Sequence, residues 1–190
     1  MKSQIKLIGI DDGPFEFQDE STVLIGVVMR ANGYLEGVLK RKICIDGSEA
    51  TSVIIDMIKK TRHRIQTKAI LIDGVAVGGF NIIDISKVYE QTGLPVITVT
   101  RNLPDLDDIK TALKGHFSDW KPRFDLIKKG ILYKLETKHN PLYFNCAGVD
   151  EHIAKEIITI STIRGVIPEP IRVAHVIASG ISRGESVGKA

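Results

Sequence analysis

The sequence predicts an α/β protein built on a mixed sheet, and two observations lead to this prediction. The first 45 residues contain three strand-like segments joined by short turns, which is typical of antiparallel strands. From residue 48 onward, amphipathic helix patterns alternate with short apolar runs, which is typical of parallel strands connected by helices. We therefore expect three antiparallel N-terminal strands followed by alternating strands and helices, with helices on both faces of the sheet.

The first half of the chain shows these patterns most clearly. Strands are expected over residues 5–10, 21–30 and 34–45, with an Asn-Gly turn signal between the last two. Ser48 is a candidate cap for a helix with one apolar face. That helix crosses over to the apolar run 69–72, whose β-branched residues predict a strand buried on both faces.

The second half alternates in the same way. We expect the following elements: a helix over 83–91, a strand over 94–100, a helix from Asn102 or Pro104 to Leu113, strands over 131–136 and 141–146, a helix capped by Asp150 and a last helix that starts at Pro170. Residues 116–130 are harder to place. Their Trp120, Lys121 and Arg123 leave two interpretations open, a nucleic-acid surface and ordinary packing.

Composition places the chain among ordinary soluble globular proteins, and we expect one domain over residues 1–190. Hydrophobic residues make up 43% and charged residues 26%, and no apolar run approaches the roughly 20 residues of a membrane span. Cys44 and Cys146 have no zinc-like spacing, so a cytoplasmic location is expected. The net charge of +3 permits a polyanionic partner without requiring one.

Three apolar runs end in aspartate, and glycine follows each within two residues. The runs end at Asp11, which Asp12 follows, at Asp46 and at Asp73, which is followed directly by Gly74. Asp-Gly after a strand is common turn chemistry. It also fits a sheet edge where strands stop, carboxylates gather and glycine lets the backbone approach a ligand. We expect Asp11, Asp46 and Asp73 to converge at one edge.

Converging carboxylates repel one another unless a cation compensates their charge. Mg²⁺ (or Mn²⁺) is the expected cation, because it prefers carboxylate oxygens and water. Paired ions of this kind also clamp the attacking and leaving oxygens of a phosphodiester. Arg101 ends the strand 94–100 and should add a positive charge at the same edge. Other chemistries are poorly served, since the sequence has no GxSxG, Walker A or HExxH motif and no GxGxxG after a strand.

Five segments also carry a family resemblance: GIDDG, GYLEGVL, ILIDGVAVGGF, LPVITVTRN and IPEPIRVAHVIA. Their order and spacing resemble endonuclease V, a ribonuclease-H-like nuclease that acts on deaminated bases. The match covers most of the chain, and the whole is most similar to an uncharacterised protein family related to endonuclease V. The resemblance implies a ribonuclease-H-like fold and a nucleic-acid partner, DNA or RNA.

The resemblance also assigns roles to residues of the predicted edge. Asp11 and Asp73 match the metal carboxylates of endonuclease V, and Asp46 takes the place of its intervening glutamate. Arg101 falls where endonuclease V has a catalytic lysine. A guanidinium there is expected to stabilise charge on a phosphate rather than to act as a base.

Two departures from endonuclease V concern other residues. Tyr34 falls on the tyrosine of its strand-separating wedge, and Leu35 and Gly37 stand beside it, but the wedge prolines are absent. Weak discrimination of deaminated bases and a preference for unpaired substrates are therefore expected. The late histidine of endonuclease V has no clear match, and Asn145 and Asp150 are the nearest candidates.

Two functions from different classes follow from these patterns. The first is a metal-dependent nuclease on DNA or RNA, with Asp11, Asp46, Asp73 and Arg101 as catalytic residues. The second is a nucleic-acid-binding protein that keeps the acidic cluster without turnover. The sequence leaves open the oligomeric state, the preferred base and the position of the cut.

Overall fold

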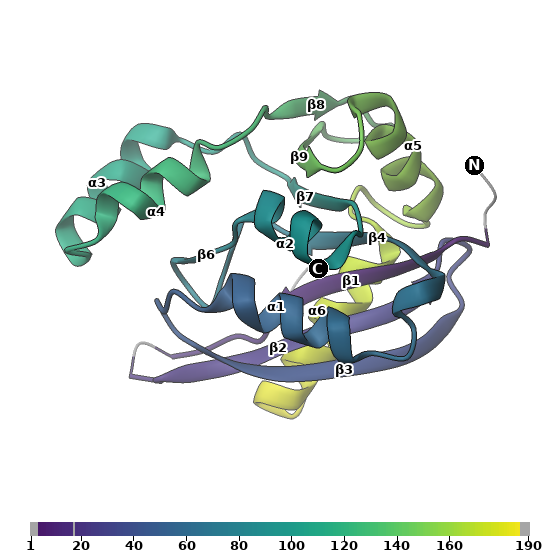
Figure 1. Cartoon of the computed structure of the whole chain (residues 1–190), viewed down its shortest axis with the longest axis horizontal. Helices are drawn as coiled ribbons and strands as arrows, with labels where there is room; N and C mark the ends of the chain where they lie inside the picture. Colours follow the sequence, from purple (N-terminus) through teal and green to yellow (C-terminus); the bar gives the residue numbers. More distant parts are fainter. Residues whose placement is uncertain (1–3, 17, 187–190) are drawn as a thin grey trace.

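A seven-stranded mixed sheet runs through residues 4–16 and 18–186, which the computed structural model describes (Figure 1). Its strand order is β3-β2-β1-β4-β7-β9-β8, and β5 and β6 form a separate two-stranded sheet. The strands are β1 (Lys6–Asp12), β2 (Ser21–Arg30), β3 (Leu35–Cys44), β4 (Thr67–Asp73), β5 (Ala76–Val77), β6 (Asn81–Ile82), β7 (Val96–Thr100), β8 (Tyr133–Leu135) and β9 (Leu142–Ala147).

The strand directions confirm the predicted mixed sheet. β1 pairs antiparallel with β2, and β2 antiparallel with β3. On its other side β1 is parallel to β4, which is parallel to β7. The hairpin of β8 and β9 closes the sheet with antiparallel pairing. The continuous apolar runs of β1 and β4 are buried on both faces, as expected of parallel strands at the centre of a sheet.

Helices cover both faces of the sheet, as predicted. They are α1 (Ala50–Lys60), α2 (Ile85–Thr92), α3 (Leu106–His116), α4 (Trp120–Ile127), α5 (Glu151–Ser161) and α6 (Glu169–Arg183), with a short 3-10 turn at Arg64–Gln66. The apolar faces of α1 and α2 pack with Ile8, Ile10, Ile70 and Ile72 in one core layer. α5 and the start of α6 pack on the opposite face, against Leu7, Ala69 and Leu71.

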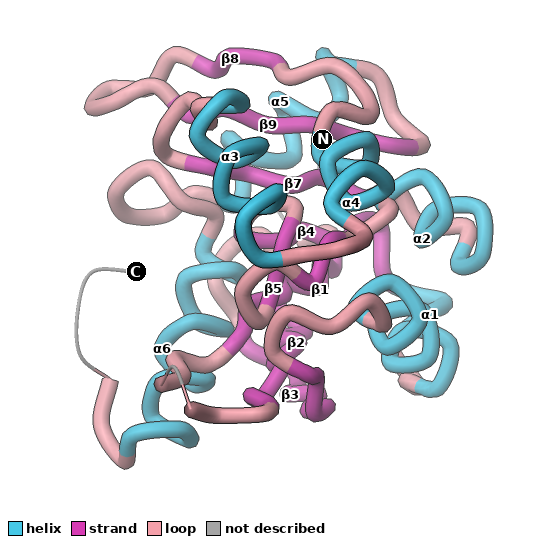
Figure 2. The backbone as a smooth tube through the Cα atoms, turned by 90° about the vertical axis from the view of Figure 1, so that its left-hand side faces the viewer, coloured by secondary structure: helices cyan, strands magenta, loops and turns pink. Residues whose placement is uncertain are grey.

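Parallel pairing brings the carboxyl ends of β1 and β4 to one edge of the sheet. β3 ends at the same edge, because Cys44 pairs with Ser21 at the start of β2 while Leu24 pairs with Asp12. Figure 2 looks toward this edge and shows α3 and α4 in front of the sheet. The β2–β3 turn lies at the opposite end, where Arg30 pairs with Lys6.

Local chemistry differs from the sequence prediction at two helices. Ser48 is not the cap of α1, whose first turn is preceded by Glu49. The Glu49 carboxylate accepts hydrogen bonds from the backbone nitrogens of Cys44 and Ser48 instead. Residues 116–130, which were hard to place, contain the helix α4. No helix among the described residues is long and apolar enough to span a membrane.

Candidate active site

Asp11 and Asp73 lie next to each other at the carboxyl ends of two parallel strands. The register pairs Ile10 with Ile72, so the following residue of each strand is an aspartate. Both isoleucines point into the core layer under α1 and α2. Because side chains alternate between the two faces of a sheet, both carboxylates point to the other face, toward α6. The predicted convergence of these two residues at one edge is confirmed.

Burial and mutual repulsion perturb the acidity of this edge. Burial, followed by the charge of Asp11, raises the pKa of Asp73 to about 6. Burial and the same charge also raise the pKa of Asp12 to about 6. Asp11 itself is only 6% exposed. Three carboxyl groups thus share a desolvated edge that favours either protons or a cation.

Asp12 points away from Asp11 and is held by a glycine-rich loop. Its carboxylate accepts a hydrogen bond from the backbone nitrogen of Gly78, at 3.0 Å. Its own backbone nitrogen donates to Oδ1 of Asp11, at 2.9 Å. Gly78 has a φ of 54° and Gly79 one of 78°, a conformation that glycine adopts without strain. The GVAVGGF segment therefore forms one wall of the acidic edge.

His175, on α6, completes the cluster and was not predicted. Its Nδ1 lies 2.9 Å from Oδ2 of Asp11, and this hydrogen bond raises the pKa of the imidazole. The signal was present in IPEPIRVAHVIA, where a histidine interrupts an apolar helix face. Only the packing of α6 across β1, far away in sequence, reveals its partner.

Gly9 explains why α6 comes close enough. It precedes Asp11 by two residues and therefore points to the same face of the sheet. A Cβ there would collide with the backbone of Pro170 and would lie 2.5 Å from the nitrogen of Ile171. The absent side chain lets the first turn of α6 rest on β1. One turn later, His175 faces Asp11.

Arg101 follows β7 at the same edge. Its positive charge lowers the pKa of Asp73 and that of His175, opposing the larger shifts toward higher pKa that both groups undergo. The side chain is exposed, so its guanidinium is accessible to a ligand. The structure thus places a cation where the sequence predicted one.

Asp46 reaches the predicted edge but is used differently from the prediction. Its Oδ1 accepts a hydrogen bond from the backbone nitrogen of Phe80, at 2.8 Å, and its own nitrogen donates to the carbonyl of Gly78. It has a φ of 56°, the only positive φ of a non-glycine residue in the described chain. Its carboxylate positions the 78–80 loop, as the carboxylate of Asp12 does through Gly78.

The Tyr34 turn lies away from the acidic edge, which contradicts its predicted place at the substrate. Tyr34 follows Arg30, which pairs with Lys6, whereas Asp11 is near the other end of the same strand. The rise along β1 from Lys6 to Asp12 is about 20 Å. Leu35 and Gly37 lie at the same end of the sheet as Tyr34. The turn therefore lies at the other end of β1 from the two aspartates.

Asn145 and Asp150, the candidates for the late histidine, have other partners. Asn145 donates from Nδ2 to the carbonyl of Lys129, at 2.8 Å. Asp150 caps α5 by accepting from the nitrogen of Ile153, which confirms its predicted cap. Neither contacts Asp11 or Asp73. The histidine that contacts Asp11 is His175, which lies on α6, downstream of both residues.

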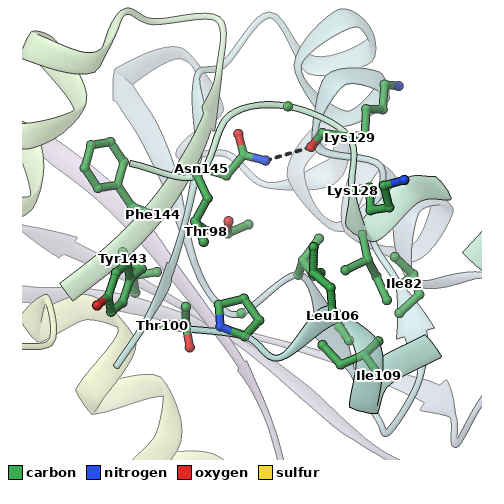
Figure 3. A pocket seen from close by; sticks show the side chains of 18 of the residues that line it. Ile82, Thr98, Thr100, Leu106, Ile109, Lys128, Lys129, Tyr143, Phe144 and Asn145 are labelled. Carbon is green, nitrogen blue, oxygen red and sulfur yellow. Dashed lines mark hydrogen bonds between the residues drawn. The ribbon is translucent and has the colours of Figure 1, made fainter. Parts of the chain in front are cut away.

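A cavity of about 600 Å³ lies beyond the ends of β4 and β7, and Figure 3 shows side chains that line it; neither Asp11 nor Asp73 is among the lining residues. Gly74 lines it at the end of β4, and Thr98 and Asn145 contribute polar groups from β7 and β9. The other walls are mostly apolar and include Phe144 from β9. The helices α3 and α4 close the remaining side through Leu106, Ile109 and Ile127. An apolar cavity with a few polar groups is typical of a small-ligand site.

The carboxylates of this edge suit a hard divalent cation. The described residues contain no group of three or more His, Cys, Asp or Glu side chains placed to hold one ion. Mg²⁺, however, keeps several waters and is commonly bound through one or two carboxylates together with substrate phosphates. Asp11 and Asp73 provide that number of carboxylates, and their crowding is relieved by positive charge.

Sequence comparison finds a family and curated relatives over the whole chain. The sequence model of the family described as Endonuclease dU matches residues 3–182. A UPF0215 protein from Methanothermobacter thermautotrophicus is 47% identical over 192 residues, covering 100% of this chain and 94% of the relative. A UPF0215 protein from Pyrococcus furiosus is 40% identical and covers 98% and 96%.

Structure comparison agrees with these relatives and extends to endonuclease V. A protein of unknown function from Archaeoglobus fulgidus has a TM-score of 0.83 and 33% identity, over 93% of this chain and 97% of that one. Human endonuclease V has a TM-score of 0.61 and 15% identity, over 92% and 83%. Endonuclease V from Ciona intestinalis, in complex with inosine-containing DNA, has a TM-score of 0.60 and 14% identity, over 90% and 83%. The ribonuclease-H-like fold is thereby confirmed.

Proposed function

The chain belongs to the Endonuclease dU family, and from this premise we propose that it is a metal-dependent endonuclease that cuts nucleic acid at deoxyuridine. The observation that carries the proposal is the pair formed by buried Asp11 and half-buried Asp73 at the ends of adjacent parallel strands. Holding two carboxylates side by side here is costly, because burial and, after it, the charge of Asp11 raise the pKa of Asp73. Such perturbed carboxyl groups are typical of sites that bind metal or catalyse a reaction.

In this proposal Asp11 and Asp73 hold Mg²⁺ or Mn²⁺, which would supply charge stabilisation and an activated water for phosphodiester hydrolysis. His175 orients the Asp11 carboxylate through Nδ1, at 2.9 Å, and restricts its rotation. Asp12 keeps the 78–80 loop against the site through Gly78. Arg101, exposed and close enough to act on Asp73, binds a substrate phosphate.

The cavity beyond the ends of β4 and β7 supports a nucleotide substrate. Its walls of Phe144, Leu106 and Ile109 would cover the faces of a base, and Thr98 and Asn145 can hydrogen-bond its edge. A base reaches such a cavity only after leaving its stack. The family name suggests uracil as the base, and the cavity, whose lining begins at Gly74 directly after Asp73, would receive it.

The test is cleavage of end-labelled oligonucleotides that contain one deoxyuridine, one deoxyinosine or no modified base, with Mg²⁺, with Mn²⁺ and with a chelator. We expect metal-dependent cleavage near deoxyuridine by the wild type, and this proposal replaces the expectation, based on the missing wedge prolines, that deaminated bases are discriminated weakly. Asp73→Asn or Asp11→Asn should lower the rate by more than about 100-fold, because loss of a direct ligand costs more than loss of its supporting hydrogen bond.

Asp46→Asn is the matched control. It removes the same charge at the same sheet edge, yet asparagine keeps the Oδ1 acceptor for Phe80 and tolerates the positive φ. We expect it to cleave at close to the wild-type rate. A wild-type protein that binds the oligonucleotides and the metal but cuts none of them would refute the enzyme and favour a non-catalytic nucleic-acid-binding protein.

A further inference from the structure

Lysines without acidic partners cover the pair of helices α3 and α4, called here the α3–α4 arm (residues 105–130). Over residues 105–130 the arm has six Lys or Arg residues and five Asp residues, three of which lie at the start of α3: Asp105, Asp107 and Asp108. Arg123 pairs with Asp119, and Lys129 pairs with Asp84. The other four form no ion pair with any residue that the structure describes: Lys110, Lys114, Lys121 and Lys128.

Aromatic rings organise these free ammonium groups into two clusters. The Nζ atoms of Lys114 and Lys121 lie 4.8 and 5.7 Å from the centre of the Trp120 ring. Those of Lys110 and Lys128 lie 5.7 and 5.3 Å from the centre of the Phe124 ring. Trp120 is half-buried, so part of its ring is open to solvent between two cations. Cations beside an accessible aromatic ring are typical of surfaces that bind single-stranded nucleic acid.

The arm is fixed to the same loop as the acidic edge. Arg123 donates from one guanidinium nitrogen to the carbonyls of Gly47 and Phe80, at 2.8 and 2.7 Å. Its guanidinium carbon lies 4.4 Å from the centre of the Phe117 ring, which packs edge-on against Phe80. Arg123 therefore anchors the arm, and it is not among the cations available to a ligand.

Two contacts connect the acidic edge with the α3–α4 arm. Phe80 follows Gly78, which binds the Asp12 carboxylate, by two residues. Lys128 both flanks Phe124 and lines the cavity (Figure 3). Lys128 thus connects the lining of the cavity with the lysines of the arm.

We propose that the α3–α4 arm binds the single-stranded segment that flanks the nucleotide held at Asp11 and Asp73, on one side of it only. Lys110, Lys114, Lys121 and Lys128 contact successive phosphates, and Trp120 stacks on a base. The inference rests on the proposed function for the position of the cleaved nucleotide. Binding to the arm itself requires neither metal nor cleavage.

The experiment measures the affinity for single-stranded oligonucleotides at several salt concentrations, with no divalent metal present. Lys114→Gln/Lys121→Gln is compared with Lys59→Gln/Lys68→Gln, which removes the same charge from exposed lysines near the opposite end of the sheet. Each lost phosphate contact lowers the slope of log K against log salt by about 0.7, so the arm variant should lose about 1.4. The control should keep the wild-type slope.

Oligonucleotides extended separately on the 5′ and 3′ sides of a central deoxyuridine locate the segment. Extension on one side should strengthen wild-type binding, and the arm variant should lose that gain. Melting temperatures close to that of the wild type establish that both variants are folded. An unchanged slope and an unchanged length dependence in the arm variant would overturn the inference.

The outcomes separate the two proposals. If Asp73→Asn abolishes cleavage while the arm variant binds as the wild type does, the nuclease stands and the arm inference falls. If the wild type cuts nothing but the arm variant loses affinity, the arm stands and the nuclease falls. If the wild type binds no oligonucleotide even at low salt, both fall, and an acidic protein becomes the expected partner of the lysines.

Discussion

At the scale of a single residue, Asp73 lowers the stability of the fold while it provides a candidate metal ligand. Its carboxyl group is buried beside Asp11, and its pKa is raised to about 6 from an ordinary value of 3.8. The folded protein therefore holds a proton there, between about pH 4 and pH 6, that the unfolded chain has already released. The loss of stability caused by the raised pKa grows as the pH rises through this range, and above the folded pKa it stays at its full value.

Asp73→Asn should consequently stabilise the metal-free protein at pH 8, by roughly 2–3 kcal/mol for a shift of about two pKa units. At pH 3.5 the advantage should nearly vanish, because Asp73 is then protonated in the folded protein. Urea unfolding of wild type and variant at both pH values measures the difference. Equal differences at the two pH values would contradict the prediction. Added Mg²⁺ should stabilise the wild type more than the variant.

At the scale of the element, α6 links the fold to the site. Its first turn lies directly on β1 at Gly9, and it packs Ala174 and Ala178 against β2. Small residues on both elements let the helix approach closely. The same approach brings His175 within hydrogen-bonding distance of Asp11. The position of α6 therefore fixes the orientation of a candidate metal carboxylate.

Gly9→Ala should destabilise the protein by about 1–3 kcal/mol, because the new methyl group collides with backbone atoms that cannot rotate away. The shift of α6 should also weaken the contact between His175 and Asp11 and so lower affinity for Mg²⁺. Chemical denaturation and calorimetric titration measure the two effects.

Gly180→Ala is the control in the same helix. A Cβ at Gly180 meets no atom within 4 Å, and alanine favours a helix over glycine by about 0.5–1 kcal/mol. This variant should therefore be slightly more stable than the wild type and bind metal normally. A Gly9→Ala protein as stable as Gly180→Ala would show that α6 does not rest on β1 as described.

At the scale of the whole molecule, the acidic edge, the cavity and the α3–α4 arm lie at one end of the central strands, and the Tyr34 turn lies at the other end. A substrate at Asp11 and Asp73 thus meets an apolar cavity and free lysines, and no wedge. We still expect unpaired substrates to be preferred to paired ones. The reason is the cavity, which a base enters only after leaving its stack, and not the Tyr34 turn.

We expect unpaired deoxyuridine to be cut faster than the same nucleotide in a duplex. A base in a duplex must be unpaired and unstacked before it enters the cavity, at a cost of a few kcal/mol, whereas a single strand avoids most of this cost. Rates on single strands, on duplexes and on duplexes with a central mismatch, at fixed salt and Mg²⁺, test this order. Fastest cleavage of the matched duplex would contradict it.

The sequence by itself determined the alternation of strands and helices, since apolar periodicity and turn residues are local signals. It also determined the edge shared by Asp11 and Asp73, because parallel strands must end on the same side of a sheet. It indicated Arg101 there for the same reason. A residue that directly follows a buried strand can be placed at the end of that strand from a few neighbouring residues alone.

Only the tertiary structure decided how the side chains at that edge are used. His175 meets Asp11 across 164 positions of sequence, through a helix placed by the absent side chain of Gly9. Asp46 shares the strand-end pattern of Asp73, yet its positive φ turns its carboxylate to Phe80. The Tyr34 turn separates from the site because the β2–β3 hairpin reverses at the far end of the sheet. Packing between distant segments fixes the first two outcomes, whereas the third follows from the antiparallel order of β1, β2 and β3, which the sequence predicted.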